Sequence, residues 1–308
     1  MRNRLFWLFV FLFLLITTAF SEEPAFPKLL YEINQFEGSG IFQKIHSAYI
    51  DENSDYLLIL NEAPLKISVF SLYDATPLRE IRIFEELKPP LLVASYQHFV
   101  YLMSSGNLLR FQEDGRKSKN FQASPELPAS ADKVLFDRTG NFICLNRNDA
   151  AVTKYNPQGK KLLEIRRDDE ERIKKEEPPI GSMDDVYVDF AGTIYIVDSK
   201  ARKIKKYNDK GEFVGALGGD RNLTRVELLQ PALVALDSQR NVWIYDMGDR
   251  KIKVLDSFGF YLGELQDTGK EGFHFISPTM MYIDRFDHLY ILDEGDTSVK
   301  VFDARGMF

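Results

Sequence analysis

The side chains best suited to chemistry are four histidines, because neutral imidazole is a common ligand of zinc. They are His46, His98, His274 and His288. None stands in the H-x-x-x-H or H-E-x-x-H spacing of helical zinc sites. His46 and His274 would approach each other only if the two ends of the chain met, and two ligands do not complete a site. We therefore expect no zinc site.

Carboxylates could instead hold calcium, which takes several oxygen ligands converging from different parts of a chain. Asp189, Asp237 and Asp284 are candidates, but they stand at equivalent positions of similar segments. Recurrence at one position favours a structural role in capping a turn. The chain also contains no G-x-S-x-G nucleophile motif and no glycine-rich phosphate loop between a strand and a helix. We expect no catalytic residue, no metal and no cofactor.

A second recurring pattern places an arginine four residues after an aspartate, as in Asp198 with Arg202 and Asp246 with Arg250. A loop of this length can fold the guanidinium back onto the carboxylate in a charge-assisted pair. The aspartate can also accept hydrogen bonds from backbone N–H groups. The pattern predicts a fastened loop.

These patterns belong to a repeat that runs along the chain. Each copy contains three apolar alternations, and the residue that ends the third marks the copy. The six marker residues are Phe70, Phe111, Tyr155, Tyr207, Leu255 and Phe302. They follow one another at steps of 41, 44, 52, 48 and 47 residues. The sequence therefore contains six copies of one structural unit.

Within a copy the apolar side chains alternate with period two, as in "TIYIVD" and "VWIYD", which is typical of short strands. Turns of the Asp-x-x-Gly type between them predict a meander of four antiparallel strands. One such sheet cannot bury its apolar faces alone, whereas sheets packed face to face around a ring can. The sequence predicts an all-β fold, a six-bladed β-propeller of four-stranded antiparallel blades.

The two ends of the chain complement each other. Only Met307 and Phe308 follow Gly306, so the last copy has no fourth strand. The segment "KLLYEI" at residues 28–33 is similar to the fourth strand "KKLLEI" at residues 160–165. We predict that residues 28–33 supply the outer strand of the last blade and close the ring.

The segment from Pro278 to Gly306 reads P-x-x-x-h-x-D-x-x-x-x-h-Y-I-h-D-x-x-x-x-h-K-h-F-D-x-x-G, where h is apolar. It resembles the NHL repeat, and the six copies are similar to the NHL family of six-bladed β-propellers. The resemblance covers nearly the whole chain after the leader and is clearest in copies three to six. It implies the propeller fold. It leaves open a binding protein or an enzyme, since related propellers include lactonases that hold a metal in the channel.

The N-terminus has the composition of a secretory signal. Two arginines precede an uncharged apolar run from Leu5 to Phe20, and Ala19 and Ser21 are small residues before Glu22. We predict a signal peptide at residues 1–21, a single propeller domain at residues 22–308, and a secreted or periplasmic protein without a stable membrane span after cleavage. An uncleaved anchor is the alternative, although the run is shorter than the ~20 residues that span a bilayer.

The mature chain would be acidic. Without Arg2 and Arg4 it has 37 basic and 46 acidic residues, a net charge of −9. This balance excludes nucleic acid as an expected partner, because phosphate binding needs clustered positive charge. The one cysteine, Cys144, lies in an apolar run and is expected to be buried. We expect a monomer.

The loops that connect neighbouring copies and the loops between the second and third strands should share one face of the ring. We refer to it as the loop face. Aromatic residues and arginine are enriched at binding surfaces. The candidate binding residues on the loop face are Arg221, Arg225, Phe273, His274, Phe275, Arg250 and Asp296. Phe273 and Phe275 have the alternative role of filling the groove between blades. A charged insertion at residues 166–179 is expected to be a short solvated helix.

The sequence therefore predicts a non-enzymatic binding or scaffolding propeller that recognises a protein, peptide or glycan through its loop face. The alternative is a metal-dependent hydrolase or lyase of the channel type, similar to a lactonase. A propeller enzyme collects its catalytic residues from distant blades and leaves no linear motif. The fold is accordingly better determined by the sequence than the function.

Overall fold

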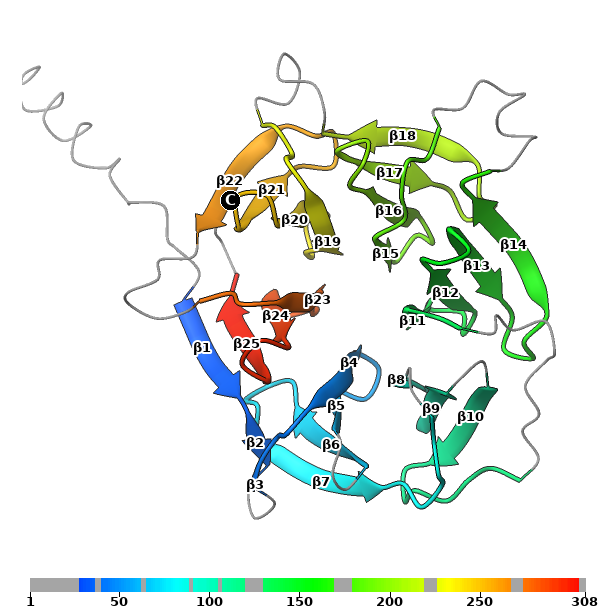
Figure 1. The fold of residues 1–308 in the computed structure, drawn as a ribbon. Helices are drawn as coiled ribbons and strands as arrows, with labels where there is room; N and C mark the ends of the chain where they lie inside the picture. The colour runs from blue at the N-terminus through cyan, green and yellow to red at the C-terminus, as the bar shows by residue number, and fades with distance from the viewer. Residues whose placement is uncertain are drawn as a thin grey trace, which may run out of the picture.

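The structure is a computed structural model that describes residues 28–36, 40–61, 65–88, 91–104, 107–119, 130–168, 179–218, 226–266 and 274–304. Within these ranges the chain forms strands and turns and no helix. Six small antiparallel sheets stand around a common centre (Figure 1). The predicted all-β, six-bladed propeller is confirmed.

The strands follow the order of the repeat, four to a blade in most copies. The first blade contains β4 (Ile45–Asp51), β5 (Tyr56–Asn61), β6 (Lys66–Ser71) and β7 (Pro77–Arg82). The second contains β8 (Leu91–Tyr96), β9 (Phe99–Ser104) and β10 (Asn107–Gln112). The third contains β11 (Lys133–Phe136), β12 (Phe142–Asn146), β13 (Ala151–Tyr155) and β14 (Lys161–Arg166).

The remaining blades complete the ring. The fourth contains β15 (Asp185–Val188), β16 (Ile194–Asp198), β17 (Lys203–Tyr207) and β18 (Phe213–Leu217). The fifth contains β19 (Pro231–Leu236), β20 (Val242–Asp246), β21 (Lys251–Leu255) and β22 (Tyr261–Gln266). The sixth contains β23 (Pro278–Ile283), β24 (His288–Asp293), β25 (Ser298–Asp303) and β1 (Lys28–Ile33), and a small hairpin of β2 (Gln35–Phe36) and β3 (Gly40–Ile41) follows β1.

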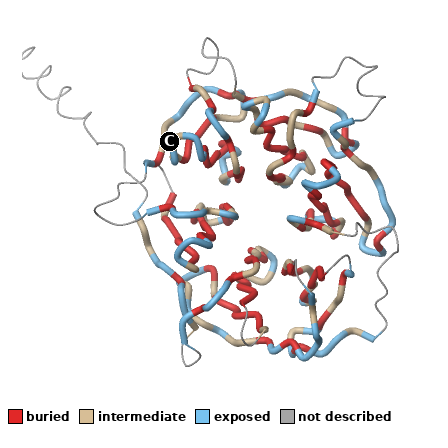
Figure 2. Tube along the Cα trace, in the orientation of Figure 1, coloured by how far each residue is buried: buried red, intermediate tan, exposed pale blue. Residues whose placement is uncertain are grey.

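The apolar core lies between neighbouring blades, as face-to-face packing of sheets requires. Trp243 of the fifth blade, for example, belongs to the same buried cluster as Leu289 and Phe302 of the sixth. Figure 2 shows buried residues on the inner strands and exposed residues on the outermost strands. The six marker residues of the repeat all lie on third strands and are all buried. The repeat register read from the sequence is therefore correct.

The ring closes through the N-terminal strand. Strand β1 has the predicted bounds, Lys28–Ile33, and pairs antiparallel with β25 from Lys28 opposite Asp303 to Ile33 opposite Val299. The blue strand β1 and the red strand β25 lie side by side in Figure 1. This pairing joins the two ends of the chain in one sheet, so the sixth blade is complete only when both ends are folded.

The second blade differs from the other five within the described residues. It has three strands, and an isolated bridge joins Phe111 to Lys117 at the place where a fourth strand begins in the other blades. Residues 120–129, and residues 169–178 of the charged insertion, lie outside the described ranges. So does the N-terminal segment at residues 1–27. Among the described residues, no helix has the length and apolar character needed to cross a membrane.

Candidate functional site

In five of the six blades the turn between the first and second strands is built around an aspartate, whereas the second blade turns at Gln97 and His98. In the fourth blade Asp189 Oδ1 accepts hydrogen bonds from the backbone N–H groups of Ala191 (2.9 Å) and Thr193 (2.8 Å). In the sixth blade Asp284 Oδ1 accepts equivalent bonds from Phe286 and His288, both at 2.8 Å. Asp51, Asp137 and Asp237 cap their turns in the same way. The recurring aspartates therefore have the predicted turn-capping role.

These turns contact one another around the whole centre of the molecule. We call them the turn ring, and it consists of residues 51–55, 96–98, 137–141, 189–193, 237–241 and 284–288. One contact at or beside the ring crosses each boundary between blades. These contacts are Ser95 Oγ to Asp51 Oδ2 (2.6 Å), the stacked rings of Tyr96 and Phe136 (5.3 Å), Arg138 over Phe190 (4.2 Å), Arg240 to Asp189 (3.0 Å), Ser238 Oγ to Asp287 Oδ2 (2.7 Å) and Arg285 to Asp55.

Three residues of these contacts adopt a backbone conformation that side chains usually avoid. Asp55, Arg240 and Asp287 have positive φ angles of 58°, 67° and 59°, in the left-handed region that favours glycine. The corresponding turns of the third and fourth blades have Gly140 and Gly192. Strained backbone persists where the surrounding structure compensates for it. In these three turns the compensation comes from a side chain that bonds to the neighbouring blade.

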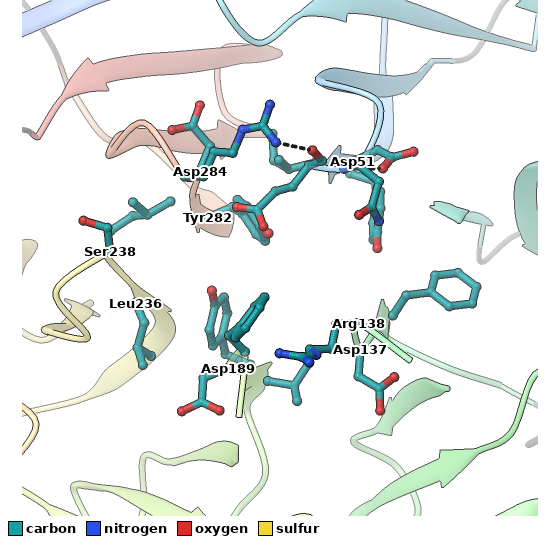
Figure 3. A pocket seen from close by; sticks show the side chains of 18 of the residues that line it. Asp51, Asp137, Arg138, Asp189, Leu236, Ser238, Tyr282 and Asp284 are labelled. Atoms are coloured by element: carbon teal, nitrogen blue, oxygen red, sulfur yellow. Dashed lines mark hydrogen bonds between the residues drawn. The ribbon is translucent and has the colours of Figure 1, made fainter. Parts of the chain in front are cut away.

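The turn ring surrounds a cavity of about 410 Å³ at the end of the channel (Figure 3). Its aromatic lining includes Tyr49, Tyr187 and Tyr282, each two residues before a turn aspartate. Tyr187 and Tyr282 belong to different blades, and their ring centroids are 6.1 Å apart at an angle of 52°. Small-molecule sites are usually concave and lined by aromatic residues with a few placed polar groups. This cavity is the candidate functional site, and we call it the turn-ring pocket.

The pocket perturbs the ionisation of its own lining. Burial raises the pKa of the Glu52 carboxyl, and the nearby Asp284 carboxylate raises it further, while Arg285 opposes the shift. Burial likewise raises the pKa of the Tyr187 phenol, and the Glu52 and Asp189 carboxylates add to that effect. The pKa of Tyr282 is raised by burial, by Tyr187 and by Glu52. The phenols of Tyr187 and Tyr282 therefore remain protonated at neutral pH, and the interior of the pocket disfavours further negative charge.

The outer rim of the pocket carries three arginines. Arg240 pairs with Asp189, and Arg285 pairs with Asp55. The Arg138 guanidinium lies over the exposed ring of Phe190, whose side chain is 78% exposed. Exposed aromatic and arginine side chains are frequent anchors in binding surfaces. The rim thus offers contact groups around an opening whose walls are fixed by the turn ring.

Four of the candidates named from the sequence, Arg250, His274, Phe275 and Asp296, are described, and they lie at the opposite end of the blades, at the loop face. Phe275 is fully buried and packs against Tyr245 and Phe302, so it fills the groove between the fifth and sixth blades. Arg250 donates to the backbone oxygen of Phe275, and exposed His274 lies 3.5 Å from Arg250. Asp296 accepts from Ser298 Oγ (2.6 Å) and pairs with Lys300.

The other three candidates, Arg221, Arg225 and Phe273, lie outside the described residues. A binding role for all seven candidates stays a prediction. Of the four that are described, Phe275 has a clear packing role, and Arg250 and Asp296 bond within the protein. None of these four described candidates lines the turn-ring pocket.

The predicted pairing of each loop aspartate with the arginine four residues later is wrong. The predicted hydrogen bonds from the loop backbone are confirmed, since Asp198 accepts from the N–H of Ala201 and Asp246 from that of Gly248, both at 3.0 Å. Asp246 pairs with Lys253 at 2.7 Å, and Asp198 pairs with Lys205 at 2.9 Å. Arg202 pairs with Glu227 instead. The lysine stands on the third strand, two residues beyond the residue opposite the aspartate, which is Lys251 for Asp246, and both side chains of the pair are buried. Residues two apart on a strand share one face of the sheet, so the lysine seven residues after the aspartate lies on the same face as the aspartate and can reach it. The arginine four residues after the aspartate lies in the loop and bonds to other groups.

These buried pairs follow a rule within the chain. Where the third strand has a lysine at this position, the second strand ends in aspartate, as in Asp198, Asp246 and Asp293. Where it has a hydroxyl residue, the second strand ends in asparagine, as in Asn61 with Ser68 and Asn146 with Thr153. Each aspartate also accepts N–H groups from the segment that enters its own blade, which for Asp246 are those of Leu229 and Gln230, both at 2.7 Å. At this end of the second strand, a buried carboxylate occurs in the three blades where a lysine is present to pair with it, as burial of an ion requires.

Acid should weaken the fold through these aspartates. Burial alone would raise their pKa values, but the backbone N–H groups and the lysines outweigh it and hold the pKa of Asp198, Asp246 and Asp293 below the usual range. A lowered carboxyl pKa stabilises the folded state above the unfolded pKa of about 4, and that contribution is lost as the pH falls through the folded value. We expect the urea midpoint to fall between about pH 4 and pH 2. The same midpoint at pH 5 and pH 2 would contradict this assignment.

Among the described residues, no group of three or more histidine, cysteine, aspartate or glutamate side chains has the arrangement of a metal site. His288 lies in the turn of the sixth blade, where its Nδ1 is 3.2 Å from Asp284 Oδ2. The titratable groups of interest for function are instead Glu52 and Tyr187 of the turn-ring pocket, whose pKa values are raised.

The sequence contained a signal for this pocket that we did not use. The pattern Tyr-x-Asp occurs at Tyr49, Tyr187 and Tyr282, at the end of the first strand in three of six copies. A tyrosine in an alternating strand is usually a core residue, so the pattern alone does not indicate a cavity. Only the ring geometry brings tyrosines from three blades to one place.

The fold and the pocket define a six-bladed β-propeller with a closed turn ring. No protein-family model matches the sequence, and no curated protein matches it. Solved structures do resemble the fold. A streptogramin B lyase superposes with a TM-score of 0.60 at 11% sequence identity, over 92% of this chain and 99% of that one.

Two further structures illustrate the range of proteins with this architecture. Virginiamycin B lyase from Staphylococcus aureus, solved as a catalytically inactive histidine-to-alanine variant with quinupristin, has a TM-score of 0.55 at 10% identity, over 91% of this chain and 90% of that one. The WD40 β-propeller domain of Doa1 has a TM-score of 0.54 at 13% identity, over 88% and 81%. At these identities the comparisons establish the fold alone.

Proposed function

We propose that this protein is a binding propeller that recognises its ligand at the turn-ring pocket and does not transform it. The observation that carries the proposal is the cavity of about 410 Å³, enclosed by turns that are joined across every blade boundary by a contact at or beside the turn ring. A site with fixed walls loses little conformational entropy when a ligand binds. The proposal moves recognition from the loop face to the turn ring.

The polar groups of the pocket favour binding over catalysis. The turn aspartates already accept hydrogen bonds from their own turns, and the described lining contains no histidine. The inactive variant of the lyase, by contrast, has lost a histidine. A lyase remains the second candidate because Glu52, which has a raised pKa, accepts a hydrogen bond from Tyr282, and perturbed carboxyls of this kind occur at catalytic sites. If the protein converts a bound ligand into a product, it is a lyase and not a binding protein.

The wider assignment follows the sequence. We propose an NHL-like propeller that is exported, loses residues 1–21 and acts as a monomer on a protein, peptide or glycan in the periplasm or outside the cell. The apolar run and the small residues before Glu22 support export. N-terminal sequencing of the exported protein tests it, since an intact Met1 would contradict cleavage.

The proposed site can be tested by comparing the two faces of the ring. Phe190 is an exposed aromatic at the rim of the turn-ring pocket, and Met247 is a half-exposed apolar side chain on the loop face. Peptide and glycan arrays probed with the purified protein would identify a ligand. We expect Phe190→Ala to weaken its binding by roughly tenfold, as loss of an aromatic anchor does, and Met247→Ala to leave it unchanged. The reverse result would return recognition to the loop face.

A further inference from the structure

The chemistry of the turn-ring pocket indicates what kind of group it binds. We propose that the pocket binds an organic ammonium group, held against the faces of Tyr49, Tyr187 and Tyr282 and beside the carboxylate of Glu52. This inference rests on the proposed function and adds the ligand class.

The first argument is the aromatic lining. The faces of phenol rings carry negative charge density and attract a cation placed within about 6 Å of the ring centroid. Tyr187 and Tyr282 are tilted by 52° with centroids 6.1 Å apart, so the two rings are not stacked face to face. Both line the cavity together with Tyr49. Within the described ranges the Tyr187 hydroxyl has no hydrogen-bond partner, which leaves it available to a ligand.

The second argument is the charge balance of the lining. Six carboxyl side chains line the cavity: Asp51, Glu52, Asp137, Asp189, Asp237 and Asp284. Three guanidinium groups line it: Arg138, Arg240 and Arg285. With all of them ionised, six negative and three positive charges give the lining a net charge of −3, and the buried Lys154, which pairs with Asp137 at 2.8 Å, reduces it to −2. The cavity therefore favours a cation over an anion.

The third argument is how these charges are compensated. Asp51 Oδ2 accepts from the neutral hydroxyl of Ser95, and Asp237 Oδ2 accepts from Asn241 and the indole of Trp243. These partners satisfy hydrogen bonds without neutralising the charge. Arg285 faces Glu52, but its guanidinium is held by Asp55 and by the backbone oxygen of Glu52.

The surroundings of Glu52 point in the same direction. Its carboxyl is close to that of Asp284, and the two like charges, together with burial, raise its pKa. A bound cation would relieve this repulsion, which is the reverse of what a bound anion would do. The cavity is larger than a single ammonium group, so the cation would be one part of a larger ligand whose remainder reaches the rim at Arg138 and Phe190.

The test uses small probes in place of the natural ligand. Choline and its neutral isostere 3,3-dimethyl-1-butanol have nearly the same shape and differ in charge, and propionate serves as the anion. We expect saturation-transfer NMR titration to show choline binding about tenfold more tightly than the isostere, the size of a desolvated cation–π contact. Cadaverine and glucosamine then distinguish an ammonium at the end of an alkyl chain from one on a sugar. Equal binding of choline and the isostere, or preferred binding of propionate, would overturn the inference.

Variants assign the binding to named side chains. Tyr187→Leu removes a ring and Glu52→Gln removes a charge, and each should weaken choline binding at least about threefold. Tyr187→Phe retains the ring and should bind choline nearly as well as the natural protein. Glu294→Gln on the loop face is the matched control for Glu52→Gln, because Glu294 is exposed and outside the pocket. If Glu52→Gln and Glu294→Gln behave alike, the inference is wrong.

The two proposals fail in different ways. An array ligand whose binding depends on Phe190 but not on charge would leave the turn-ring pocket as the binding site and refute the ammonium assignment. Choline binding that is insensitive to Tyr187→Leu would refute both the ammonium assignment and the pocket as its site. Melting curves for every variant establish that each is folded before its affinity is compared.

Discussion

Replacing Lys253 by methionine is expected to lower the free energy of unfolding by about 3 kcal/mol or more. Lys253 is 3% exposed and lies between Asp246 at 2.7 Å and Asp249 at 2.7 Å. Methionine fills a similar volume but leaves two carboxylates beside each other without a cation, and an uncompensated buried charge costs much more than a surface pair contributes. Urea denaturation at pH 7 measures the change.

The chain itself supplies the control for this prediction. The third blade has Asn146 and Thr153 where the fifth has Asp246 and Lys253. The double variant Asp246→Asn with Lys253→Thr reproduces that neutral arrangement, so it should lose less stability than Lys253→Met alone. A double variant less stable than the single one would contradict the view that charge matching explains the pairs.

Replacing Ile33 by aspartate is expected to destabilise the protein by about 3 kcal/mol or more, since it places a charge in an apolar cluster. Ile33 is 6% exposed on the closing strand β1 and packs in one cluster with Phe42, Ile45 and Val299. The substitution acts at the junction where the two ends of the chain meet, so loss of β1 would open the edge of β25 as well.

Its control lies on the same strand. Glu32 is exposed and pairs across the sheet with Lys300 through the backbone register. Glu32→Gln should change the urea midpoint little, because surface substitutions are usually within about 0.5 kcal/mol of neutral. If Ile33→Asp unfolds at the same urea concentration as the natural protein, closure by β1 does not stabilise the ring.

The repeat made the fold predictable from the sequence. The marker residues, from Phe70 to Phe302, recur at steps of 41 to 52 residues, and each lies buried on a third strand. The closing strand at Lys28–Ile33 was predictable for a similar reason, since it resembles the fourth strand of another copy. A signal that repeats six times corrects local ambiguity, which a single short strand does not.

The loop pairing was not predictable from local spacing. Arg250 is near Asp246 in the sequence, but it occupies the left-handed region at φ 59° and bonds to Phe275 of the next blade segment. The partner of Asp246 is Lys253, which the hairpin returns to it. Strand pairing, not distance along the loop, determines which side chains meet.

The turn-ring pocket could be predicted only in part. The role of Asp189 and Asp284 in capping turns follows from their recurrence. The cavity does not, because it depends on side chains from different blades, such as Tyr49 and Tyr187, meeting across the centre. Sites of this kind are assembled by tertiary structure, and the sequence carries only their separate pieces.

The most direct test of the central claim is hydrogen–deuterium exchange with and without the ligand identified from the arrays. A ligand that binds at the turn ring should slow exchange in residues 51–55, 137–141 and 189–193, which line the pocket or lie beside it. Loop-face segments at residues 199–202, 247–250 and 294–297 should exchange as before. Protection confined to those loop-face segments would contradict the account.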